Sequence, residues 1–156
     1  MRKRIIGEVD SVNFTQTFEW LDLQRIAQVE ISSEEAMHPI EDALKVDGPG
    51  WRASTSGPQT IRIVFDEPQT VRRVRLTFVE EHQERKQEFG LYWSAAHDRS
   101  LQEIVRQQFQ FSPSGAVREI EEYRTDLSNV RILELRIDPD RDGGLQHASL
   151  EHFLVA

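Results

Sequence analysis

The chain has 156 residues, a length typical of one domain and sufficient to bury a core without covalent cross-links. It contains no cysteine, which excludes disulfides, thiolate metal sites, iron–sulfur ligation and a thiol nucleophile. Its formal net charge of −8, from 19 basic and 27 acidic residues, argues against a general phosphate-binding surface. The hydrophobic residues, 38% of the chain, occur in short patterned runs, so we predict a folded acidic domain.

The N-terminal segment Met1–Gly7 is basic and then briefly apolar, and Glu8 ends the apolar run. A signal peptide needs about 7–15 apolar residues and a membrane-spanning helix about 20, so neither is expected. We therefore expect a cytoplasmic protein with no membrane partner. No repeat or linker divides the chain, which predicts a single domain over 1–156, with 1–24 as an N-terminal extension or a first strand.

The first predicted elements are a strand around Arg25–Ile31 and a short helix after it. Ser32 and Glu35 have the spacing of a capping box, and Pro39 suits the first turn of a helix. Apolar residues at helical spacing follow, namely Ile40, Ala43 and Leu44. The Gly48-Pro49-Gly50 triplet predicts the end of this helix.

Alternation of apolar and polar residues predicts strands over most of the remaining chain. A turn is expected at Asp66-Glu67-Pro68, and the last strand is expected to pair with the one around Arg25–Ile31. One polar alternating segment, Val117–Thr125, suits an edge strand. The pattern predicts an all-β fold, an antiparallel β-sandwich of jelly-roll type with one short helix. The predicted strands are Gln59–Phe65, Val71–Val79, Glu88–Ser94, Ile104–Phe111, Val117–Thr125, Val130–Ile137 and Ala148–Val155.

A series of motifs lies between Ile31 and Ile61: the paired serines after Ile31, the short helix, the Asp47-Gly48 loop, Trp51 and an apolar strand. In this order they resemble the opening of a discoidin-type domain, also called the coagulation-factor C-type or galactose-binding-like domain. The resemblance continues to the end of the chain and covers about residues 25–156. The later motifs are Leu91-Tyr92-Trp93-Ser94, His97-Asp98 and Ala148-Ser149-Leu150-Glu151. The resemblance implies a sandwich that binds sugars, lipids, proteins or nucleic-acid ends, usually through loops at one end.

Part of the same stretch, from Ser32-Ser33-Glu34 to Thr60-Ile61, is similar to the amino-terminal domain of the animal scaffold of DNA single-strand-break repair. This similarity ends after the first strand of the sheet. Because the net charge of −8 is wrong for a DNA groove, we interpret it as a shared fold. Nucleic acid is therefore not the expected partner.

The candidate ligand residues come from two turns and the strand between them, with Arg52 added from the segment after Gly50. The polar loop Glu80–Glu88 supplies hydrogen-bond donors, and the next turn supplies two more. If both turns lie at the same end of the sandwich, they frame a patch of the size of a sugar. The alternative interpretation is a solvated hairpin loop. The complete predicted ligand-binding set is His82, Arg85, Tyr92, His97, Arg99 and Arg52.

Metal binding is a weaker hypothesis. The resemblance implies a structural calcium site near Asp47 and Glu151, but Pro49 and Gly50 stand where further ligands are usual. A plain turn is the preferred interpretation there, and no cofactor is expected.

Catalysis has little support in the sequence. Glu119 and Glu121 would share one face of the predicted edge strand, whereas a glycosidase needs two carboxylates facing each other across a cleft. No nucleophile elbow, phosphate loop or dinucleotide turn is present.

The leading hypothesis is a non-enzymatic binding module with carbohydrate as the ligand. The alternative is a protein-interaction or assembly domain that pairs through an exposed edge such as Val117–Thr125. Binding to nucleic-acid strand breaks is a third hypothesis. The sequence leaves the oligomeric state open.

Overall fold

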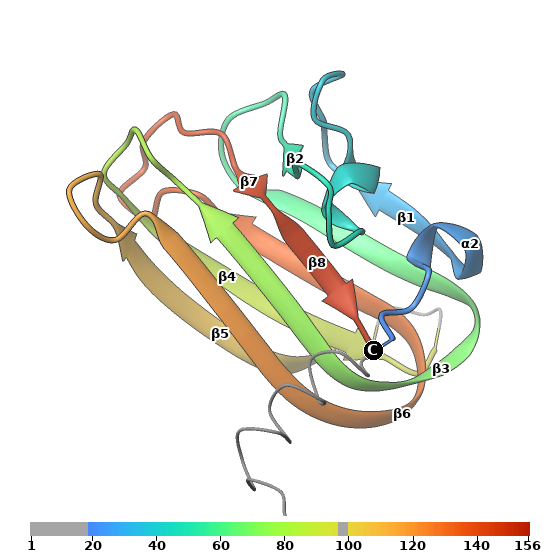
Figure 1. Cartoon of the computed structure of the whole chain (residues 1–156). Coiled ribbons are helices and arrows are strands. Elements are labelled where there is room, and N and C mark those ends of the chain that lie inside the picture. The colour runs from blue at the N-terminus through green and yellow to red at the C-terminus, as the bar shows by residue number, and fades with distance from the viewer. Residues whose placement is uncertain (1–18, 97–99) are drawn as a thin grey trace, which may run out of the picture.

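The computed structural model describes residues 19–96 and 100–156, which form two antiparallel β-sheets packed face to face (Figure 1). The all-β antiparallel sandwich predicted from the alternating pattern is thus confirmed. Its helical elements are α2 (Leu23–Ile26) and the 3-10 helix η1 (Ile40–Ala43). Its strands are β1 (Ala27–Ile31), β2 (Trp51–Arg52), β3 (Gln59–Val79), β4 (Arg85–Ser94), β5 (Gln102–Phe111), β6 (Arg118–Asp138), β7 (Ser149–Leu150) and β8 (His152–Val155).

Strands β3 and β6, each of 21 residues, bend midway and contribute to both layers (Figure 1). What we call the large sheet has the order β1-β3-β6-β4-β5 and uses the first half of β3 with the second half of β6. The small sheet pairs residues 71–79 of β3 with 118–124 of β6 on one side and with β8 on the other. Two long strands therefore hold both layers together without a disulfide.

The bend replaces a turn that the sequence predicts. Register shifts between Val64 and Arg73 show that β3 continues as a bulged strand through Asp66-Glu67-Pro68. The turn predicted there is wrong, because the chain changes layer without reversing within one sheet. The two strands predicted on either side of 126–129 are likewise one strand, β6, with positive φ at Asp126 and Asn129 where it bends.

The last strand does not pair as predicted. β8 pairs with β3 at Val74–Thr77 rather than with β1, and the preceding β7 pairs with β2. The reason is that the second half of β3 forms the centre of the small sheet and leaves one edge there for the C-terminal strand. The N-terminal segment still contacts β8, because the Leu21 amide donates to the Val155 carbonyl at 2.7 Å.

The predicted helix is a single 3-10 turn, η1, and its cap differs from the prediction. Ser32 does not cap it but exchanges hydrogen bonds with the backbone of Thr60 in the neighbouring strand. The Glu34 carboxylate instead accepts a hydrogen bond from the Ile40 amide at 2.8 Å. The segment therefore uses Ser32 to extend the sheet and Glu34 to begin the turn.

The core lies between the two inner faces and consists of the apolar residues of the alternating strands. Trp51 is buried there, and its indole N–H donates to the Ser33 carbonyl at 3.0 Å, as expected for a structural tryptophan. The other large, fully buried side chains include Phe65, Phe78, Phe89, Phe111 and Phe153.

Candidate functional site

A pocket of about 360 Å³ lies on the outer face of the large sheet, over β3, β6, β4 and β5, and we call it the sheet-face pocket. The side chains that project from this face are polar because the opposite side of each strand faces the core. Gly90 is at the centre, paired with Arg136 on one side and Arg106 on the other. The pocket is lined by Pro58, Gln59, Thr60, Glu88, Phe89, Gly90, Tyr92, Arg106, Arg136, Ile137 and Asp138.

The absence of a side chain at Gly90 makes room for the ring of Tyr92. A Cβ atom at Gly90 would lie 2.6 Å from the Tyr92 hydroxyl and 2.7 Å from its Cε2 atom. The guanidinium of Arg136 covers the ring at 4.3 Å from its centroid. On the other side, Nη2 of Arg106 donates to the Tyr92 hydroxyl at 3.4 Å. Tyr92 is therefore held between two arginines.

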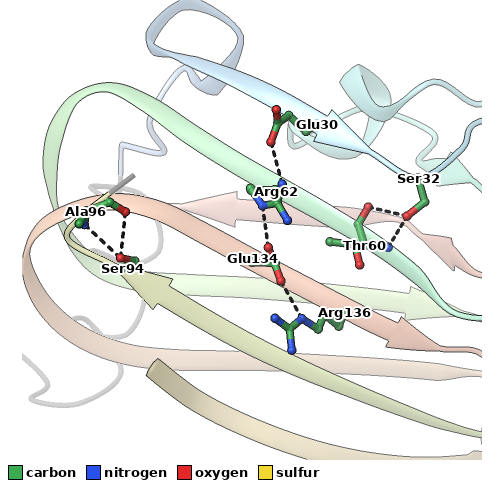
Figure 2. Close-up of polar contacts among 8 residues, drawn as sticks. All are labelled: Glu30, Ser32, Thr60, Arg62, Ser94, Ala96, Glu134 and Arg136. Carbon is green, nitrogen blue, oxygen red and sulfur yellow. Dashed lines mark hydrogen bonds and ion pairs between the residues drawn. The ribbon is translucent and has the colours of Figure 1, made fainter. Parts of the chain in front are cut away.

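A line of charged residues crosses the same face from β1 to β6 (Figure 2). Glu134 has only 2% of its side chain exposed, and its two oxygens accept hydrogen bonds from Nε of Arg62 and Nε of Arg136, each at 2.6 Å. Glu30 binds the other side of Arg62 at 2.9 Å. The hydrogen bonds that Arg62 donates to Glu134 and to Glu30 raise the pKa of its guanidinium. This ladder fixes the orientation of Arg136 before any ligand arrives.

The acceptor groups of the pocket lie in the adjacent row of the sheet. Glu88 pairs with Asp138 in register, and both project to the outer face. Glu88 accepts hydrogen bonds from Gln108 at 3.2 Å and from Arg141 at 3.1 Å. The pocket therefore presents guanidinium donors on one side and carboxylate acceptors on the other, an arrangement suited to a ligand with several hydroxyl groups.

A second, smaller pocket of about 170 Å³ lies at the end of the sandwich, beside β2 and β7. Its lining includes His38, Arg52, Ser149 and Glu151 over the buried Trp51. Arg52 is exposed and binds Glu35 at 3.1 Å. Of the predicted ligand residues, Arg52 is the one that lines this end pocket, and Tyr92 is the one that lines the sheet-face pocket.

The structure places the remaining predicted residues differently. Arg85 has 0% of its side chain exposed, because it binds Glu80 at 2.8 Å and also donates to Gln87 and to the Pro139 carbonyl. Its prediction as a ligand donor at the surface is wrong, since its contacts lie inside the sandwich. His82 is exposed in the loop before β4. His97 and Arg99 lie outside the described residues.

The loop with His82 and the described start of the next turn, Ala95–Ala96, lie at opposite ends of β4. The loop with His82 precedes Arg85, whereas the next turn begins after Ser94, whose hydroxyl bonds the backbone of Ala96 (Figure 2). The 10 residues of β4 span about 30 Å at about 3.3 Å per residue.

The acidic residues predicted to lie on an exposed edge point into the sandwich. The segment 118–124 of β6 pairs only with β3 among the described strands, as predicted for an edge. However, Glu119 shares its face with Phe78 and is 2% exposed. Burial, followed by the charge of Glu121, raises the pKa of Glu119 to about 8. Neither oxygen of the Glu119 carboxylate accepts a hydrogen bond from the described part of the chain.

The residues proposed for calcium have other roles or stand apart. Glu151 binds Arg118 at 2.7 Å, and Asp47 is exposed in the turn before β2. Within residues 19–96 and 100–156, no three His, Asp or Glu side chains are grouped as for a metal ion.

Sequence reasoning missed Gly90, Arg106 and Arg136. Each belongs to a different strand, and only the register of β4 with β5 and β6 brings them together. The available signal was Gly90 itself, since a glycine inside an alternating strand often marks the close approach of another group.

Comparison with known proteins shows the fold. The chain matches a pectin-binding carbohydrate-binding module over 84% of its own length and 90% of that chain, with a TM-score of 0.59 and 17% identity. The family 32 module of C. perfringens NanJ, solved with galactose, gives a TM-score of 0.59 at 13% identity, covering 87% of this chain and 96% of that one. A Ruminococcus gnavus GH29 fucosidase gives 0.68 at 13% identity, covering 92% of this chain but 28% of the fucosidase.

These similarities show that the chain has the β-sandwich fold of family 32 carbohydrate-binding modules. No family model matches the sequence, and no curated protein is significantly similar to it. In the described part of the chain, no helix has the length and apolar character needed to cross a membrane.

Proposed function

We propose that this chain is a non-catalytic carbohydrate-binding module that binds sugar in the sheet-face pocket. The observation that carries the proposal is the set of opposed donors and acceptors around Tyr92. Arg136 and Arg106 supply the donors, and Glu88 and Asp138 supply the acceptors. A sugar hydroxyl can both donate and accept a hydrogen bond, so a row of donors beside a row of acceptors suits it.

The position of the pocket on a sheet supports binding without a large rearrangement. Strands β3, β6 and β4 are paired on both sides beneath the pocket, β5 forms the edge of the sheet, and the buried Glu134 holds Arg136 in place. Such a prearranged site loses little conformational entropy when ligand binds. The similarity to modules that are themselves described with pectin and galactose supports the same ligand class.

Titration calorimetry against soluble pectin, alginate and galactan oligosaccharides tests the proposal. We expect at least one of them to bind, and we expect Tyr92→Ala to weaken that binding about tenfold or more. Arg52→Gln, in the end pocket, is the matched control. Binding lost in Arg52→Gln and retained in Tyr92→Ala would move the site to the end pocket, and no binding at millimolar sugar would reject the function.

A protein-assembly function is the second candidate, supported by the free edge of β6. Residues 118–124 pair only with β3 in the described part of the chain, and Ile120 on the outer face is 56% exposed. This candidate would be supported if light scattering showed a dimer and the Ile120→Lys variant were a monomer. Binding of nicked DNA with a steep salt dependence would instead support the nucleic-acid hypothesis.

A further inference from the structure

We propose that the sheet-face pocket recognises the carboxylate of an acidic sugar, a uronate, through Arg136 and Arg106; the inference rests on the proposed carbohydrate-binding function. Both arginines are in register with Gly90 and stand on either side of it. With no side chain between them, the two guanidinium groups converge on Tyr92. Guanidinium groups bind carboxylates with planar, charge-assisted hydrogen bonds.

Each arginine is oriented by a carboxylate that engages its Nε atom. Nε of Arg136 donates to Glu134 at 2.6 Å, and Nε of Arg106 lies 3.2 Å from Glu103. Within the described residues, both Nη atoms of Arg136 and Nη1 of Arg106 have no hydrogen-bond partner in the protein. The side chains of Arg136 and Arg106 are 51% and 58% exposed, so these donors can meet a ligand.

The carboxylate that orients Arg136 is divided between two guanidinium groups. Glu134 is shared, because one of its oxygens binds Arg62 and the other binds Arg136. Glu30 compensates Arg62 from β1, on the far side of β3 from the pocket. A ligand carboxylate would complete the pairing that Glu134 provides only in part.

The acceptors in the adjacent row limit what else the ligand can carry. Glu88 is engaged by Arg141 and Gln108, and Asp138 accepts a hydrogen bond from the Asp140 amide at 3.3 Å. Both would repel a second anionic group but can accept hydroxyl hydrogens. One carboxylate over the arginines and several hydroxyls over the acids is the substitution pattern of a uronate ring.

The test compares binding of an oligogalacturonate, a neutral galacto-oligosaccharide and a sulfated galactan oligosaccharide matched in length, by calorimetry at constant ionic strength. We expect the oligogalacturonate to bind about tenfold or more tightly than the neutral sugar, and Arg136→Gln or Arg106→Gln to remove that preference. Arg124→Gln, an exposed residue of the small sheet, changes the net charge equally and should leave the preference intact.

Gly90→Ala tests the geometry without changing any charge. Its Cβ would displace the Tyr92 ring, so the uronate preference should fall although both arginines remain. Circular dichroism and thermal unfolding of each variant establish that it is folded.

The outcomes separate the inference from the function on which it rests. Neutral and acidic sugars bound equally, with binding weakened in Tyr92→Ala, would overturn the uronate assignment and keep the carbohydrate function. Tighter binding of the sulfated sugar, or an equal loss in Arg124→Gln, would also overturn it. No binding of any of the three sugars would reject the carbohydrate function itself.

Discussion

The buried Glu119 should make the protein less stable as the pH rises, and Glu119→Gln should remove that dependence. In the fold, burial and then the charge of Glu121 raise the pKa of Glu119 from 4.5 to about 8, against the opposing influence of Gln87 and Arg85. The folded state therefore holds a proton that the unfolded chain has already lost between these pH values. Stabilisation by this proton is complete below about pH 4.5 and is lost as the pH rises to about 8.

The size of the effect follows from that interval. At about 1.36 kcal/mol for each pH unit, a range from 4.5 to about 8 corresponds to an upper limit of about 5 kcal/mol. Glutamine has nearly the same shape and no charge, and its amide can donate to Glu121 while its oxygen accepts from Gln87. We therefore expect Glu119→Gln to raise the free energy of unfolding at pH 8 by roughly 2–5 kcal/mol, and by much less at pH 5.

Urea unfolding monitored by tryptophan fluorescence at several pH values between 5 and 8 measures this directly, because Trp51 is buried in the folded state. Glu84→Gln, which removes an exposed carboxylate from the loop before β4, is the control and should leave the pH dependence unchanged. The reasoning would be refuted if Glu119→Gln were no more stable than the parent chain at pH 8, or if its stability fell with pH by the same amount.

Three further predictions concern other parts of the fold. Trp51→Ala should cost about 3–5 kcal/mol in urea unfolding, because it empties the core and removes the indole hydrogen bond to Ser33. Glu134→Ala should lower the free energy of unfolding by about 2–3 kcal/mol and lower the melting temperature, because Arg62 and Arg136 lose their shared acceptor. Burial opposes the shift, but hydrogen bonds from Arg73 and Arg75 lower the pKa of Glu122. The stability that the ionised Glu122 contributes should therefore be lost as the pH falls below about 4.5. A Glu122→Gln variant should show a smaller loss of stability between pH 5 and 3 by the same assay.

The alternating pattern predicts the sheet content and the core well, because a strand with one buried face has a period of two whatever its partners. It fails at Asp66-Glu67-Pro68, where a turn signal is accommodated by a bulged bend within one long strand. Local residue preferences cannot distinguish a reversal within one sheet from a bend into the other, since both need a break in regular pairing. The pairing of β8 with β3 rather than with β1 is missed for the same reason, because the bend in β3 creates the edge that β8 occupies.

The candidate site depends on information that a local pattern does not contain. Tyr92 is predicted from its place on a strand, but its partner Arg136 is 44 positions further along the chain, and only strand register brings them together. In β6 the alternation of apolar and polar residues also predicts the wrong buried face. There Glu119 faces the interior and Ile120 faces outward, because the pairing with the apolar face of β3 decides the orientation.

Two buried glutamates on β6 show how the surroundings of a carboxylate decide its effect. Glu134 and Glu119 are each 2% exposed, yet Glu134 accepts hydrogen bonds from two arginines whereas Glu119 has no hydrogen-bond partner in the described residues. Glu134 thereby orients Arg136 beside the sheet-face pocket, so its substitution should weaken both stability and binding. Glu119 points into the core from the small sheet, away from that pocket, so Glu119→Gln should raise stability without changing sugar affinity. A change in affinity in Glu119→Gln would mean that the two sheets are coupled across the core.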